Sequence, residues 1–158
     1  MYINPDHFLE TPEGRVITPE RNAWAWEECY RVLHETLRKA SSRSSLYVMV
    51  GAQASGKSTW ARRKQSEEPA AIIFDAILVK RSEREPILLA AARHRVPVVA
   101  VWLRTTLDEC VERNSKRSPN EMVNERGLRN VFAALEPPEV DEGFTAIVEV
   151  RCGEGTAQ

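Results

Sequence analysis

Cysteine is scarce in this sequence, and the positions of the cysteines argue against a set of structural disulfides. The 158-residue chain contains three cysteines, an odd number with no C-x-x-C pair among them. They stand far apart, at Cys29, Cys110 and Cys152. Such a scattered set argues against a disulfide framework and predicts reduced thiols in a cytoplasmic protein.

The sequence also lacks an excess of either charge and any long apolar run. Its net charge is −1, which argues against a surface that coats a long duplex but still permits a short basic pocket for one phosphorylated end. No apolar run is long enough to span a bilayer and no secretory signal is evident, so we expect no membrane partner. The composition, 42% hydrophobic and 28% charged, predicts one soluble domain over residues 1–158 and leaves its oligomeric state open.

What the sequence does contain is a phosphate-binding loop. Residues 51–58 read Gly-Ala-Gln-Ala-Ser-Gly-Lys-Ser, with the spacing G-x-x-x-x-G-K-S. The apolar run 46–50 before it predicts a buried strand, and residues 58–64 after it predict a helix. Strand, loop and helix form the context that this motif requires. Gly51 and Gly56 allow the tight turn that brings backbone N–H groups onto phosphate oxygens.

The loop predicts binding of ATP and Mg²⁺. Lys57 would reach the β- and γ-phosphates, and Ser58 would ligate Mg²⁺. The helix that follows adds a favourable dipole at its N-terminus. The predicted nucleotide-binding residues are Gly51, Ala54, Ser55, Gly56, Lys57, Ser58 and Thr59. The loop alone does not say which group receives a phosphate.

The rest of the chain alternates between apolar runs and amphipathic stretches. Strands are predicted at 2–4, 70–75, 97–103 and 144–150. Helices are predicted at 20–40, 82–95, 105–116 and 120–135, with a loop at 9–19. Capping boxes at 82–85 and 105–108 are expected to begin two of the helices, and Trp24 is expected on the apolar face of the first. This alternation predicts an α/β fold with a mainly parallel sheet.

Asp75 ends the strand predicted at 70–75. In open α/β sheets the carboxyl ends of the strands form the edge where ligands bind. A carboxylate at this point is suited to order the water around Mg²⁺ or to act on an acceptor hydroxyl. The alternative is a helix cap or a solvated loop acid.

The segment 113–117 places three cations in five residues before a proline. Cations are favourable at any helix C-terminus, so a solvated helix end is one interpretation. Because phosphoryl transfer spreads negative charge that arginines from a mobile lid stabilise, we favour a lid in which Arg113 and Arg117 bind phosphate.

Four stretches together resemble the 5′-hydroxyl polynucleotide kinases, a branch of the P-loop kinases. GKSTWAR (56–62) and RNSKR (113–117) resemble the phosphate loop and lid of the phage enzyme. PVVAVWLRTTLDECVERN (97–114) is similar to the strand-to-lid stretch of related bacterial AAA-type kinases, and LEPPEVDEGFTAIVEV (135–150) to the C-terminal segment of the animal kinase domain. The resemblance covers most of residues 46–151. It implies a three-layer P-loop kinase-like fold, ATP and Mg²⁺ as cofactors, and a nucleic acid end as substrate.

The sequence departs from that family in one place. The family usually has two acidic strands after the P-loop helix: the first carries the Asp that deprotonates the acceptor hydroxyl, and the second ends in an Asp followed by a Thr-Asn pair. Here one such strand, ending at Asp75, precedes residue 97, and Ala76-Ile77 stands where the Thr-Asn pair would be.

The N-terminal segment 1–45 resembles the missing part. Residues 2–9 and the helix predicted after them resemble a short strand, an Asp and helices. We hypothesise a permuted order in which this segment supplies one edge of the sheet and Asp6 as general base, while residues 46–151 form the nucleotide-binding core and lid. The alternative is a helical decoration with Asp6 as an exposed acid near a frayed terminus.

These observations predict an ATP-dependent kinase that transfers the γ-phosphate to a hydroxyl, preferably the 5′-OH of a polynucleotide. Asp6, or failing that Asp75, would accept the hydroxyl proton. One alternative is a small-molecule kinase acting on a sugar, nucleotide sugar or antibiotic, which the overall charge favours slightly. Another is a nucleotide-binding module without turnover, which the replaced Thr-Asn pair favours.

Overall fold

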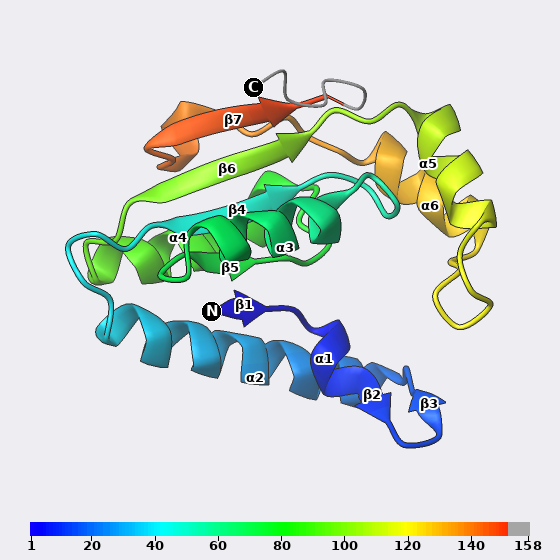
Figure 1. Ribbon diagram of the computed structural model, residues 1–158, viewed down its shortest axis with the longest axis horizontal. Coiled ribbons are helices and arrows are strands. Elements are labelled where there is room, and N and C mark those ends of the chain that lie inside the picture. The colour runs from blue at the N-terminus through cyan, green and yellow to red at the C-terminus, as the bar shows by residue number, and fades with distance from the viewer. Residues whose placement is uncertain (152–158) are drawn as a thin grey trace.

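A five-stranded sheet, with all neighbouring strands parallel, forms the centre of the computed structural model, which describes residues 1–151 (Figure 1). Its order is β1-β5-β4-β6-β7. The strands are β1 (Tyr2–Ile3), β4 (Leu46–Val50), β5 (Ile72–Phe74), β6 (Val98–Leu103) and β7 (Ala146–Val150). Each was predicted from the sequence; β4 has the predicted bounds, and each of the others differs from its prediction by one or two residues at one or both ends.

Helices cover both faces of the sheet. The larger core cluster packs α2 (Pro19–Arg38) and α4 (Arg81–Arg93) against one face, and a smaller cluster packs α3 (Lys57–Glu67) against the other. The remaining elements are α1 (Asp6–Leu9), α5 (Leu107–Ser115), α6 (Glu125–Ala133), the short 3-10 helix η1 (Val140–Glu142) and an antiparallel hairpin of β2 (Glu10–Thr11) and β3 (Gly14–Arg15). The fold is therefore a three-layer α/β fold of the P-loop type, as predicted.

The N-terminal strand is an integral part of the sheet. β1 pairs in parallel with β5, in the register Tyr2↔Ile73 and Ile3↔Phe74. Ile3 is buried in the core shared with α2 and α4. The chain then runs through α1 and the hairpin, returns along α2, and enters the sheet again at β4 (Figure 1). The edge strand of the sheet thus comes from sequence that precedes the phosphate-binding loop.

The apolar face of α2 differs from the prediction at its first turns. Ala25, Cys29, Leu33 and Leu37 are buried at helical spacing, whereas Trp24 is 46% exposed. Its ring instead stands edge-on to Phe8. The stripe therefore starts one residue later, because the four-residue repeat that ends at Leu37 passes through Ala25.

Three predicted boundaries are wrong for local reasons. Residues 9–19 hold the β2–β3 hairpin rather than only a loop. The backbone N–H of Lys80 donates to the Glu83 side chain, so the N-cap of α4 is Lys80, two residues before the Ser82 expected from the capping box. α6 begins at Glu125 rather than near residue 120, because the Asn124 side chain caps its first turn.

Cys29 and Cys110 are both buried in the core. Cys152 lies outside the described residues. Within residues 1–151, no helix combines the length and the apolar character needed to cross a membrane.

Candidate nucleotide and phosphoryl-transfer site

The phosphate-binding loop connects β4 to α3 at the carboxyl edge of the sheet. Its backbone takes the left-handed region at Ala54 (φ 60°) and at Gly56 (φ 104°). Gly51 is also required, since a methyl group added there would lie 2.8 Å from Ser55 Oγ and 3.1 Å from Leu103 Cβ. This turn directs successive N–H groups inward and forms a concave anion-binding surface.

Lys57 lies across the mouth of this loop. Its Nζ donates to the carbonyl oxygens of Gly51 at 2.8 Å and Ala52 at 2.9 Å. Burial lowers the pKa of Lys57, and the nearby negative charge of Asp75 partly offsets this shift. A desolvated cation whose hydrogen bonds go to neutral carbonyls is suited to bind an anion.

Ser58 and Asp75 stand opposite each other, one at the start of α3 and one directly after β5. The Ser58 hydroxyl donates to Asp75 Oδ2 at 3.0 Å, and Asp75 is 2% exposed. A hydroxyl and a carboxylate beside a phosphate site are the hard oxygen donors that Mg²⁺ prefers. The residues therefore fit the predicted pairing of Ser58 as Mg²⁺ ligand with Asp75 beside it.

A buried polar atom also points to a ligand in the loop. Among the described residues, Ser55 Oγ is buried without a hydrogen-bond partner. Buried hydroxyls are normally satisfied, so this atom fits a site completed by a phosphate group. Thr59, in the first turn of α3, is exposed, and the N–H groups of that turn lack partners within the helix.

Thr105 fixes the outer wall of the loop. Its Oγ1 donates to the Ser55 carbonyl at 2.7 Å, and the residue is 4% exposed. The sequence interpretation had assigned Thr105 to a capping box. The N-cap of α5 is instead Thr106, whose hydroxyl accepts from Glu109 N. Because the two threonines are adjacent, the sequence alone placed the N-cap one residue too early.

The basic segment lies over the loop. The Arg113 guanidinium is adjacent to Gly56, where an added methyl group would lie 3.7 Å from Nη1. The positive charge of Arg117 acts on Lys57 and, after burial, contributes to lowering its pKa. The structure thus brings both arginines near the phosphate-binding loop.

Two features that the sequence interpretation missed hold this lid. Asn114 is buried, and its amide donates to the Val123 carbonyl at 2.7 Å and accepts from Val123 N at 3.0 Å. Cys110 and Leu128 pack with Ala52 of the loop in a small separate core. The lid segment Asn114–Val123 is therefore closed at its base and rests on the nucleotide site through α5 and α6.

Asp6 begins α1 at the same edge of the sheet. Its Oδ2 accepts from Arg15 Nη1 at 3.1 Å, while Arg15 also pairs with Glu10 at 2.8 Å. The charge of Asp6 is among those that act on Lys57. Glu121, in the lid segment, is close enough to act electrostatically on Arg15. The N-terminal hairpin and the lid therefore flank the phosphate site, and Arg15 was not anticipated from the sequence.

The residues after Asp75 cannot replace a Thr-Asn pair. Ala76 is buried and Ile77 is 41% exposed, and neither side chain can donate a hydrogen bond. The segment directly after Asp75 is therefore apolar.

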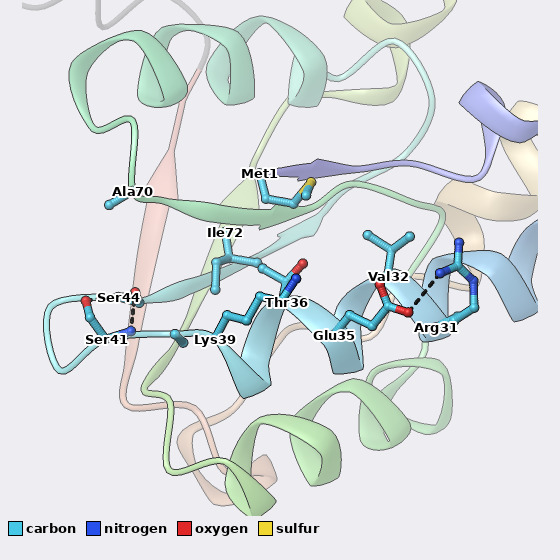
Figure 2. Close-up of a pocket in the computed structure, with 11 residues that line it drawn as sticks. Met1, Arg31, Val32, Glu35, Thr36, Lys39, Ser41, Ser44, Ala70 and Ile72 are labelled. Atoms are coloured by element: carbon cyan, nitrogen blue, oxygen red, sulfur yellow. Dashed lines mark hydrogen bonds and ion pairs between the residues drawn. The ribbon is translucent and has the colours of Figure 1, made fainter.

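A cavity of about 430 Å³ lies at the opposite edge of the sheet (Figure 2). Met1, Ser44 and Ala70 line it together with the C-terminal turn of α2. It lies at the amino ends of the strands, away from the phosphate-binding loop. We therefore assign no chemistry to it.

Comparison with known proteins agrees with this geometry. A family model described as "AAA domain" matches residues 64–138, just under half of the chain, from the last turns of α3 through α6. The match supports a nucleotide-binding protein of P-loop kinase-like type. It begins after the loop 51–58, so the loop geometry is independent support for the same conclusion. No curated protein matches the sequence.

Proposed function

We propose that the protein is an ATP- and Mg²⁺-dependent kinase whose preferred acceptor is the 5′-hydroxyl of a nucleic acid end. One observation carries the proposal: a single edge of the sheet combines a phosphate-binding loop, a buried carboxylate beside Ser58, two lid arginines and the N-terminal carboxylate of Asp6. These are the parts that phosphoryl transfer to a hydroxyl needs.

The nucleotide would be bound by residues 51–59. The backbone N–H groups of the loop and Ser55 Oγ would face phosphate oxygens, and Lys57 would move from its two carbonyl partners onto the β- and γ-phosphates. Ser58 and Asp75 would hold Mg²⁺, which supplies charge neutralisation when bound. Arg113 and Arg117 would stabilise the charge that develops on the transferred group.

Asp6 is the better candidate for the general base. Asp75 is 2% exposed and already accepts a hydrogen bond from Ser58, whereas the Asp6 side chain is 49% exposed. Arg15 holds Asp6 Oδ2, so Oδ1 can take the proton of an acceptor hydroxyl. The acceptor oxygen then bonds to the γ-phosphorus, the bond to the β–γ bridging oxygen breaks, and ADP leaves with that electron pair.

This assignment makes residues 1–45 the acceptor half of a permuted kinase domain. The position of β1 beside β5, and of Asp6 after β1, supports the permuted order over a peripheral decoration. The resemblance of residues 46–151 to polynucleotide kinases supports the acceptor class.

A small-molecule acceptor is the second candidate, and the charge around Asp6 favours it. Arg15 is paired with both Asp6 and Glu10, so the N-terminal side offers no excess positive charge to a nucleic acid backbone. A compact sugar or nucleotide hydroxyl needs no such excess.

A binding role without turnover is the third candidate. Its support is the apolar pair Ala76 and Ile77, which offers no side-chain hydrogen bond to an acceptor.

The test is transfer of label from γ-labelled ATP to oligonucleotides. Purified protein is mixed with Mg²⁺ and 5′-hydroxyl DNA or RNA, with Lys57→Ala as the inactive control and 5′-phosphorylated oligonucleotides as the blocked acceptor. We expect label at the 5′ end that excess glycerol or ribose does not compete away. Asp6→Asn should lower kcat by about 100-fold with nucleotide affinity unchanged, whereas Asp75→Asn should weaken Mg²⁺-dependent binding.

Each alternative gives a different result. Transfer to sugars but to no oligonucleotide would overturn the polynucleotide acceptor and support the small-molecule kinase. Nucleotide binding with no transfer to any hydroxyl would overturn the kinase itself.

A further inference from the structure

Tyr2 reaches the proposed Mg²⁺ site from β1, the edge strand beside β5. Its hydroxyl donates to Asp75 Oδ2 at 2.6 Å, although the two residues are 73 positions apart. The Ser58 hydroxyl donates to the same oxygen at 3.0 Å. Two hydroxyls, one from the N-terminal strand and one from α3, thus converge on one oxygen of a buried carboxylate.

The position of Tyr2 is fixed from several sides. The backbone of Tyr2 is paired with Ile73 in the sheet. The Asn4 amide donates to the Tyr2 hydroxyl at 3.1 Å, and the His7 ring stands edge-on at 5.2 Å between centroids. A side chain held in this way loses little further freedom when it orients a neighbour.

The direction of this hydrogen bond follows from the two groups. A carboxylate has no proton to donate, so the Tyr2 hydroxyl is the donor to Asp75 Oδ2. Both hydroxyl groups bond Asp75 Oδ2, so neither of them occupies Asp75 Oδ1.

We propose that Tyr2 is a positioning residue for Mg²⁺-dependent nucleotide binding, because it anchors one oxygen of Asp75 and leaves the other for the hydrated cation. The N-terminal strand is then a working part of the nucleotide site as well as of the acceptor side. The inference rests on the proposed binding of Mg²⁺ and nucleotide here, and it is independent of which acceptor the protein uses.

The test compares two tyrosines on the same face of the sheet. Tyr2→Phe removes the hydroxyl beside Asp75. Tyr47→Phe is the matched control, because the Tyr47 hydroxyl also bonds a carboxylate, that of Glu68 at 3.2 Å, but away from the loop. Calorimetry would measure ADP affinity in EDTA, and Mg²⁺ affinity for the protein saturated with ADP. ADP is not turned over, so no acceptor is needed.

We expect Tyr2→Phe to weaken Mg²⁺ affinity about tenfold, as loss of an outer partner of a metal ligand does. ADP affinity in EDTA should stay within about twofold for Tyr2→Phe and for Tyr47→Phe, because both variants keep Lys57 and the backbone N–H groups of the phosphate-binding loop. Amide exchange of β1 would check that the strand stays docked in both variants.

Three results would overturn the inference. The first is unchanged Mg²⁺ affinity in Tyr2→Phe. The second is an equal loss with and without Mg²⁺ together with faster exchange of β1, which is the result of a merely structural role. The third is absence of Mg²⁺-dependent ADP binding in the unmodified protein, which would overturn the proposed cofactor too. If these affinities are as expected but no phosphate reaches an oligonucleotide, the proposed acceptor is overturned, whereas the role of Tyr2 stands on the affinities.

Discussion

At the scale of single residues, the shape of the phosphate-binding loop depends on side chains outside the loop motif. Thr105 and Thr106 are adjacent and chemically identical, yet one supports the Ser55 carbonyl and the other caps α5. Both hydroxyls are local hydrogen-bonding groups, and only the direction in which the chain leaves β6 decides which one turns inward. Substitution of each therefore separates loop shape from helix stability.

We expect Thr105→Val to weaken ATP binding by about fivefold and to lower the free energy of unfolding by about 1–2 kcal/mol. Valine keeps the volume but leaves a buried carbonyl without its donor, and a loop that is less preorganised binds less tightly. Calorimetric titration and urea unfolding measure the two quantities. Thr106→Val should cost about 1 kcal/mol for its lost cap and leave ATP affinity unchanged. Equal losses of affinity in both variants would contradict the assignment.

At the scale of elements, α5 and the residues directly after it bring two arginines to the phosphate-binding loop. Arg113 on α5 and Arg117 after it act at the loop, whereas Lys116, the C-cap residue between them, is directed to Glu112 on α5. We expect Arg113→Ala or Arg117→Ala to reduce phosphoryl transfer by at least about 100-fold with ATP affinity changed far less, since such cations stabilise developing charge.

Lys116→Ala removes the same charge from the same segment and is the matched control. Single-turnover rates for the three variants, with saturating ATP, provide the comparison. An equal loss of rate in Lys116→Ala would mean that the segment acts through its overall charge and that the two arginines have no specific position.

A buried ion pair joins α4 to the chain after α6. Arg84 and the Glu142 side chain are almost completely buried and form a two-point contact, at 2.8 and 2.7 Å. Arg84 Nη1 also donates to the carbonyls of Leu78, Val79 and Glu136. The contact fixes the connection that leads into β7.

We expect Glu142→Gln to lower the free energy of unfolding by about 3 kcal/mol, because it leaves the Arg84 charge buried without a counter-charge. Asp141→Asn, which breaks the neighbouring exposed pair with Arg81, should cost below about 1 kcal/mol. Urea unfolding of both variants tests this. Similar small losses would show that water reaches Arg84 in solution.

The sequence predicted elements better than it predicted contacts between elements. The continuous apolar runs around Val48 and Val101 predicted buried strands correctly, because parallel strands covered on both faces have few polar positions. Arg84 stood in a pattern that predicted a helix cap, and nothing local revealed that Glu142 would bury beside it. Tyr2, Arg15 and Thr105 likewise act on partners that are distant in sequence or in another element, and spacing along the chain does not encode such pairs.

At the scale of the whole molecule, position in the sheet matters more than order in the chain. β1 occupies the edge beside β5, although the resemblance predicts that a strand in this role follows α3. To restore the family's order, the chain would have to be cut and rejoined near residues 1, 40 and 70, and these three points lie close together. Met1 N lies 2.7 Å from the Ala71 carbonyl, and Lys39, Ala40 and Ala70 line one cavity (Figure 2). Short linkers can therefore join these points without moving any element.

We expect a rearranged chain in the order 46–69, 2–40, 70–158, with two short Gly-Ser linkers, to fold and bind Mg²⁺ and ATP within about threefold of the original affinity. Every strand keeps its neighbours, and the cost of closing loops changes slowly with their length. Circular dichroism, thermal unfolding and nucleotide titration provide the comparison. A control with a Gly-Ser spacer in place of 2–40 should fail, because it exposes the β5 edge and removes Tyr2 from Asp75. If the rearranged chain also fails while the original order folds, residues 1–45 need their natural connection to β4, and the permuted-domain interpretation loses its physical basis.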